Sequence, residues 1–166
     1  EGIDLNRQEV FFVGQNKENF QSMIVEGRGF DPQFSPEGDR LLYSVYSGDT
    51  GMNPNLWISG AQGDNIGSKR SNLSVATWAS KCTFKDNVTV LCAVPEELDR
   101  GSGLFPELAA TTKDQLYEIN TITGLKKLLA VPAGAANMSD LSVSDDGFHL
   151  FFTDKTDNRL YKMRLK

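Results

Sequence analysis

Hydrophobic and polar positions alternate over short stretches of this chain, and turn residues separate the stretches. In "FDPQFSPEGDRLLYSVY" (30–46), an apolar segment runs into Ser-Pro-Glu-Gly, where proline fixes φ and glycine accepts a positive φ. The strand after this turn is apolar on both faces, with Leu41, Tyr43 and Val45 on one and Leu42 and Tyr46 on the other. Such a strand lies between two packed layers. The pattern predicts a tight antiparallel hairpin inside a layered all-β fold.

The same hairpin pattern recurs along the chain. "LSVSDDGFHLFFTD" (141–154) repeats the turn and the following strand, and "TFKDNVTVLCAV" (83–94) is a weaker copy. After each hairpin comes a strand that starts with an aliphatic–aromatic pair, and the copies are Leu56-Trp57, Leu116-Tyr117 and Leu160-Tyr161, with Val10–Val13 as a fourth. A repeat of about 45 residues is in the range of β-propeller blades.

These elements divide the chain into repeats. We expect a partial blade (8–25), a complete blade (30–73), a blade (76–131) with an insertion at 95–114, and an incomplete blade (138–166). Phe20–Val25 and Leu125–Val131 are good candidates for the last strand of a repeat, and Ile66–Leu73 is a poor one. The predicted fold is an all-β propeller segment of three to four blades, each a four-stranded antiparallel sheet. A β-sandwich would not show this periodic motif. The strands are too few to close a ring, so we expect part of a larger propeller.

Two stretches carry a family resemblance. "FDPQFSPEGDRLLYS" followed by "NLWIS", and "LSVSDDGFHLFFTD" followed by "RLYKMRL", resemble the WD40-like (TolB-type, PD40) propeller repeat. "KCTFKDNVTVLCAVP" departs from that pattern and is similar to a cysteine-bracketed variant in exported bacterial propeller proteins. The resemblance covers most of the chain from about Phe30 onward. It implies the fold strongly and the function weakly.

The two cysteines are placed symmetrically about the turn of the third hairpin. Cys82 and Cys92 each lie two residues further from the turn than Phe84 and Val90. In an antiparallel hairpin they would face each other within the range of a disulfide. We predict a disulfide, with two buried free thiols as the alternative. A disulfide would indicate an oxidising compartment.

The candidates for catalysis and metal binding are weak. His149 is the single histidine and lies between Phe148 and Leu150, a packed strand position. No nucleophile elbow is present. The acidic groups at 145–146 and 154–158 are typical of turns and lack the ligand set of a calcium loop. We therefore expect no catalytic residue, no metal and no cofactor. Related propellers accompany prolyl-oligopeptidase enzymes, and the resemblance implies that catalysis there belongs to a separate hydrolase domain.

The insertion 95–114 is the segment most suggestive of binding, because long loops in compact domains are usually functional or disordered. Its apolar and charged residues fit a protein-binding patch, and we single out Glu96, Glu97, Asp99, Arg100, Leu104, Phe105 and Leu108. The alternative is that Phe105 covers the end of the blade core. In a propeller this loop shares one face with the loops at 26–31, 47–54, 68–75 and 132–137.

The charge and composition of the chain limit the classes of molecule that it is expected to bind. The formal net charge is −5, and no basic stripe is present, which argues against nucleic acid and against an anionic membrane surface. Any membrane contact would come through an anchor outside this chain. We expect a non-catalytic recognition or scaffold module that binds a protein partner, located in the periplasm or at the cell surface. The alternative is an accessory propeller that gates a hydrolase or peptidase domain elsewhere. A third possibility is carbohydrate binding by exposed aromatic side chains, but Trp57 and Trp78 occupy or flank strand positions and we expect both in the core. An open C-terminal sheet edge is expected to pair with another strand.

Overall fold

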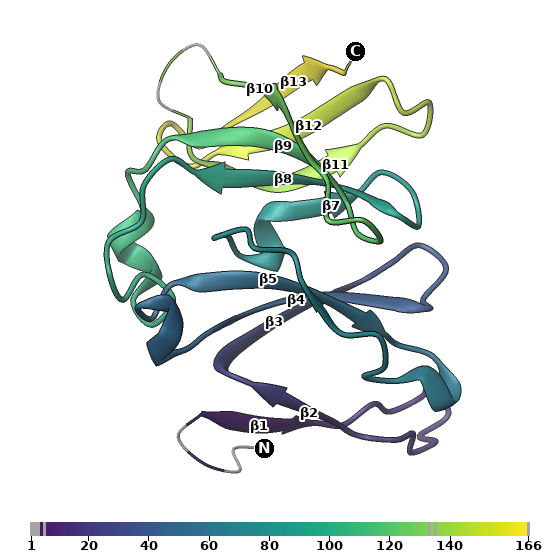
Figure 1. The fold of residues 1–166 in the computed structure, drawn as a ribbon. Helices are drawn as coiled ribbons and strands as arrows, with labels where there is room; N and C mark the ends of the chain where they lie inside the picture. The colour runs from purple at the N-terminus through teal and green to yellow at the C-terminus, as the bar shows by residue number, and fades with distance from the viewer. Residues whose placement is uncertain (1–3, 5, 133, 135, 166) are drawn as a thin grey trace.

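The computed structural model describes residues 4, 6–132, 134 and 136–165, and within them the chain is all-β. Thirteen strands form four antiparallel sheets (Figure 1). The all-β prediction is confirmed. In chain order the sheets have two, four, four and three strands, so the two middle sheets have the full four strands and the first and last are shorter, as the sequence predicts for a partial first repeat and an incomplete last repeat.

The strands follow one another along the chain, and each pairs with its sequence neighbour in the same sheet. The first two sheets contain β1 (Arg7–Val10) and β2 (Met23–Glu26), then β3 (Arg28–Phe34), β4 (Arg40–Tyr46), β5 (Pro54–Gly60) and β6 (Ser71–Asn72). The last two contain β7 (Cys82–Phe84), β8 (Thr89–Pro95), β9 (Asp114–Asn120) and β10 (Lys126–Ala130), then β11 (Met138–Val143), β12 (His149–Asp154) and β13 (Arg159–Arg164).

The helical elements of the described residues are short 3₁₀ turns. They are η1 (Gly48–Thr50), η2 (Gly63–Asn65), η3 (Ala79–Lys81) and η4 (Pro106–Ala109). None of the helices in this part of the chain has the length and apolar character needed to cross a membrane.

The four sheets are stacked face to face, and a hydrophobic cluster fills each space between them (Figure 1). Strand β4 shows how the alternating sequence builds this stack. Leu41, Tyr43 and Val45 belong to the cluster shared with the first sheet, whereas Leu42 belongs to the cluster shared with the third. The prediction that this strand lies between two packed layers is confirmed.

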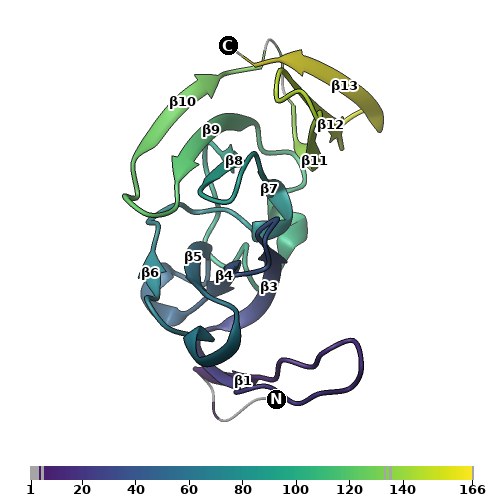
Figure 2. The same cartoon turned by 90° about the vertical axis from the view of Figure 1, so that its right-hand side faces the viewer.

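The sheets share a common orientation in the stack. Strands β3, β7 and β11, which begin the last three sheets, lie along one side, and β6 and β10 lie along the other (Figure 2). The stack does not close on itself. Among the described residues, no sheet covers the outer face of the first sheet or of the last.

The two best sequence copies of the hairpin turn make the same hydrogen bonds. The backbone N–H of Ser35 donates to the carbonyl of Arg40, and the backbone N–H of Ser144 donates to that of His149. Each serine hydroxyl accepts the returning N–H, from Arg40 at 3.2 Å and from His149 at 3.0 Å. Gly38 and Gly147 have φ of 71° and 72°, a left-handed conformation that glycine adopts without a Cβ penalty.

The N-terminal hairpin departs from expectation. The sequence pattern predicts a strand at Val10–Val13, but β1 covers Arg7–Val10, and beyond it Val13 makes only an isolated bridge to Asn19. Phe11 and Val13 are exposed there. The aliphatic–aromatic pattern matched the other repeats, but it does not distinguish a paired strand from an extended hairpin tip. The poor candidate at 66–73 forms only the two-residue strand β6.

Candidate protein-binding surface

The two cysteines stabilise the hairpin that carries the insertion. Cys82 and Cys92 are direct partners in the register of β7 and β8, with Cα atoms 4.0 Å apart, and a disulfide joins them. Both side chains are buried in the cluster between the second and third sheets. The predicted pairing is therefore present. It links β7, an edge strand of the third sheet, to β8, whose end leads into the loop 95–114.

Loop 95–114 connects β8 to β9 and contains η4, on the left-hand side of Figure 1. Its three singled-out apolar side chains are exposed: Leu104 by 47%, Phe105 by 51% and Leu108 by 42%. Phe105 does not belong to any of the three core clusters. The alternative that Phe105 covers the blade core is therefore wrong.

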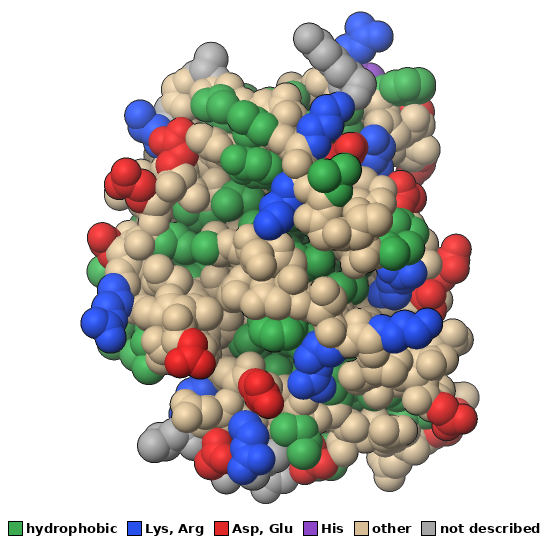
Figure 3. Space-filling model, in the orientation of Figure 1, with side chains coloured by type: hydrophobic (Ala, Val, Ile, Leu, Met, Phe, Trp, Pro, Cys, Tyr) green, Lys and Arg blue, Asp and Glu red, His purple; other side chains and the backbone are tan. Residues whose placement is uncertain are grey.

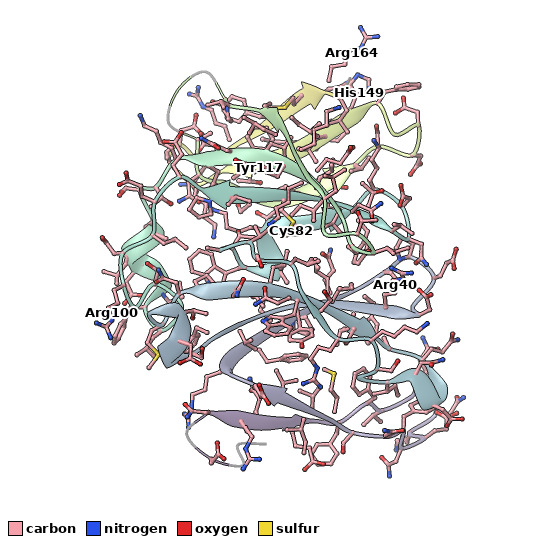
Figure 4. The ribbon with its side chains drawn as sticks, in the orientation of Figure 1. Arg40, Cys82, Arg100, Tyr117, His149 and Arg164 are labelled. Carbon is pink, nitrogen blue, oxygen red and sulfur yellow. A yellow bond between two sulfur atoms is a disulfide. The ribbon has the colours of Figure 1, made fainter. Side chains whose placement is uncertain are left out.

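Charged side chains of the same loop are exposed as well. Glu96, Glu97, Asp99 and Arg100 are all exposed, and Arg100 projects outward at the edge of the molecule (Figure 4). Hydrophobic, acidic and basic side chains border one another along this edge (Figure 3). The loop thus carries all seven predicted residues on the surface. We call these seven residues the loop surface.

The first half of the loop is anchored to the loop between β4 and β5. Gly101 N–H donates to the carbonyl of Gly51 at 3.0 Å, and Gly103 N–H donates to that of Met52 at 2.8 Å. Gly103 has to be glycine here, because a Cβ at this position would lie 2.6 Å from the Cβ of Tyr46. Two adjacent sheets therefore support the loop together.

The second half is anchored by a buried polar network. Lys81 Nζ lies 2.7 Å from Asp114 Oδ2 and also donates to Asn137 Oδ1 at 3.1 Å. Asn137 in turn donates through Nδ2 to the carbonyl of Ala109, the last residue of η4, at 2.7 Å. Asp114 Oδ2 accepts the Met138 N–H at 2.6 Å. The network connects η4 to the third and fourth sheets.

In this network, burial and the contact between opposite charges shift the pKa values of Lys81 and Asp114 in opposite directions. Burial lowers the pKa of the Lys81 ammonium group and raises the pKa of the Asp114 carboxyl group, since a low-dielectric interior penalises both charges. Their mutual contact acts in the opposite direction on both groups. Each charge is therefore tolerated only because the other is present.

Asp146 and His149, which the sequence analysis considered as metal or catalytic candidates, have structural surroundings that the structure defines. Asp146 Oδ1 accepts the hydroxyl of Ser144 and the N–H of Phe148, so this carboxylate fixes a turn. His149 Nδ1 lies 3.9 Å from Asp146 Oδ1 on the outer face of the last sheet. Within the described ranges, no group of three or more His, Cys, Asp or Glu side chains is arranged to hold a metal ion.

Sequence analysis missed an apolar groove at the N-terminal end of the stack. A cavity of about 610 Å³ is lined mostly by apolar side chains, among them Phe11, Phe20 and Phe34, which are all exposed. The sequence pattern places Phe11 and Phe12 in the middle of the predicted strand Val10–Val13. The apolar run at 10–13 is visible in the sequence. Because β1 ends at Val10, the residues after it line a surface groove and do not continue the strand.

Comparisons with known proteins add no identification. No family model matches the chain, and no curated protein matches it significantly. The likeness to WD40-like repeats therefore stays a resemblance.

Proposed function

We propose that this chain is a non-catalytic recognition module that binds a protein partner through the loop surface. The observation that carries the proposal is the exposure of Leu104, Phe105 and Leu108, together with charged residues of the same loop, which is anchored at both ends. Apolar anchors inside a polar rim are the usual anatomy of a protein interface.

The anchoring supports binding energetically. Fully burying one Leu or Phe side chain stabilises a complex by roughly 1.5–3 kcal/mol. Ordering a mobile side chain costs about 0.5–1.5 kcal/mol on binding, and a loop that is already fixed avoids much of the backbone part of this cost. Loops held by a rigid scaffold are common sites of recognition.

The scaffold itself we infer to be an arc of a β-propeller of the TolB type. The matching turns at Ser35 and Ser144 and the repeat of about 45 residues support this assignment. The alignment of β3, β7 and β11 on one side of the stack agrees with sheets that radiate from a common axis. The disulfide is compatible with an oxidising compartment, and the periplasm or cell surface is the location we propose.

Site-specific cross-linking tests the binding surface. A photo-reactive amino acid replaces Phe105 in one variant and the exposed Ile122, in the β9–β10 loop, in another. We expect irradiation in the native cells to yield a discrete cross-linked protein from position 105 and not from position 122.

The captured protein is then purified and its affinity measured by calorimetry. Leu104→Ser with Leu108→Ser should weaken binding at least tenfold, about 1.4 kcal/mol, whereas Ile122→Ser should leave it unchanged. Equal cross-linking from both positions, or equal affinity of the two variants, would contradict the proposal.

A further inference from the structure

A second cavity lies between the first and second sheets, on the same side of the stack as the loop at 47–54. Its volume is about 890 Å³. That size is within the range of small-molecule sites. The lining includes Glu26, Asp49, Asn55, Trp57 and Asn72, together with Asp4 and Arg7, which form an ion pair with each other at 2.8 Å. None of these residues belongs to the loop surface, so this cavity is a separate site.

Strand geometry brings three of these side chains to one face. Asn55 and Trp57 are two residues apart on β5, and Trp57 is the register partner of Asn72 on β6. Side chains at alternate positions and at opposed positions of an antiparallel pair share a face. Trp57 packs on the cluster shared with the first sheet, which identifies this face as the one lining the cavity.

The two amide side chains are oriented by the backbone. Asn55 Oδ1 accepts the N–H of Leu56 at 3.1 Å, and Asn72 Oδ1 accepts the N–H of Ser74 at 2.7 Å. Each amide oxygen already accepts one backbone N–H, which fixes the orientation of the amide group. The NH₂ groups are therefore the parts of both side chains left to donate to a ligand.

The aromatic and acidic groups complete the lining. The ring of Trp57 is stacked on Tyr43, 10° from parallel with centroids 6.5 Å apart, so the indole plane is fixed. Within the described residues, the carboxylates of Glu26 and Asp49 make no hydrogen bond or ion pair. The cavity thus combines a fixed indole, two amide donors, two acceptor carboxylates and the ion pair of Asp4 and Arg7.

From this combination we propose that the cavity binds a neutral sugar. Sugar hydroxyl groups donate to carboxylates and accept from amide NH₂ groups, while the C–H face of a pyranose packs on an indole ring. The carboxylates of Glu26 and Asp49 disfavour an anionic ligand, because the charge of Arg7 is already balanced by Asp4. The volume accommodates a mono- or disaccharide.

Calorimetric titration of the unmodified chain tests binding. The probes are cellobiose, maltose, lactose and chitobiose, each up to about 50 mM, well above the millimolar dissociation constant of a weak site. We expect saturable binding of at least one. No saturable heat with any of the four would overturn the proposal.

Matched variants then test the location. Asn55→Asp and Asn72→Asp each keep an oxygen that accepts the backbone N–H, replace the NH₂ donors by a carboxylate oxygen and add one negative charge, which the control variant adds as well. Asn120→Asp is the control, since Asn120 Oδ1 likewise accepts the N–H groups of Ile122 and Thr123 in a turn outside the cavity lining. Each cavity variant should weaken binding about tenfold or more, and the control should not. Equal effects in all three would contradict the site.

Fluorescence gives an independent readout of the same position. The chain has two tryptophans, Trp57 and Trp78. In the Trp78→Phe variant, the remaining emission comes from Trp57 and should change with the same sugar concentration dependence as the heat. In Trp57→Phe the change should be absent. A sugar-dependent signal that persists in Trp57→Phe would place binding elsewhere.

Discussion

At the scale of single residues, the most consequential contact is the buried pair of Lys81 and Asp114. Their side chains are 10% and 0% exposed. Burial of charge is costly, and removing one partner of such a pair leaves the other uncompensated. This pair also belongs to the network that holds η4, so stability and the geometry of the loop surface depend on the same atoms.

We predict that Asp114→Asn lowers the free energy of unfolding by about 3–5 kcal/mol, because the Lys81 charge would stay buried without its counter-ion. The control is Glu118→Gln, which removes the partner of Lys85 in an ion pair that is 32% and 28% exposed. That change should cost less than about 1 kcal/mol. Urea unfolding of both variants measures the difference, and equal losses would show that the buried pair is not required.

A second residue-scale prediction concerns the repeated turns. Gly38→Ala and Gly147→Ala should each destabilise by about 1–2 kcal/mol, since both positions have positive φ and an L side chain resists that conformation. An added Cβ would meet nothing within 4 Å at either position, so the effect isolates the backbone. Gly48→Ala is the control, with equally open space and no positive φ. Thermal unfolding that ranks Gly48→Ala with the other two would contradict this explanation.

At the scale of elements, the sequence predicted the hairpins well and the N-terminal strand poorly. Alternation together with a Ser-x-x-Gly turn defines β3–β4 and β11–β12, because local patterning and turn chemistry agree there. The start of the chain has apolar residues without such a turn, and β1 was misplaced. The anchoring of loop 95–114 could not be predicted, since Ser102 donates to Asn53, 49 residues earlier. Contacts this distant leave no local pattern.

The prediction at the scale of elements is that the Cys82–Cys92 disulfide stabilises the fold. Reduction, or replacement of both cysteines by alanine, should lower the free energy of unfolding by roughly 3 kcal/mol in the loop-entropy model. The lost constraint would affect the β7–β8 hairpin first. Hydrogen exchange with and without reductant should therefore show faster exchange at 82–92 than at 40–60. Uniform protection in both states would contradict a stabilising role.

At the scale of the whole molecule, the stack has two open ends. Strand β13 pairs only with β12, and β1 pairs only with β2, among the residues described. Leu160 is 71% exposed on the outer face of the last sheet, and Ile24 is 49% exposed on that of the first. Unpaired strand edges and exposed apolar faces recruit further strands. We therefore predict that this chain associates through its ends.

Sedimentation velocity over roughly 1–100 µM, a range that covers micromolar association, tests the open stack most directly. We predict concentration-dependent association of the unmodified chain. Leu160→Lys combined with Ile24→Lys should abolish it, and Ile122→Lys, which changes an exposed loop residue away from both ends, should not. An unmodified chain that stays monomeric at every concentration would contradict an arc of stacked sheets with adhesive ends.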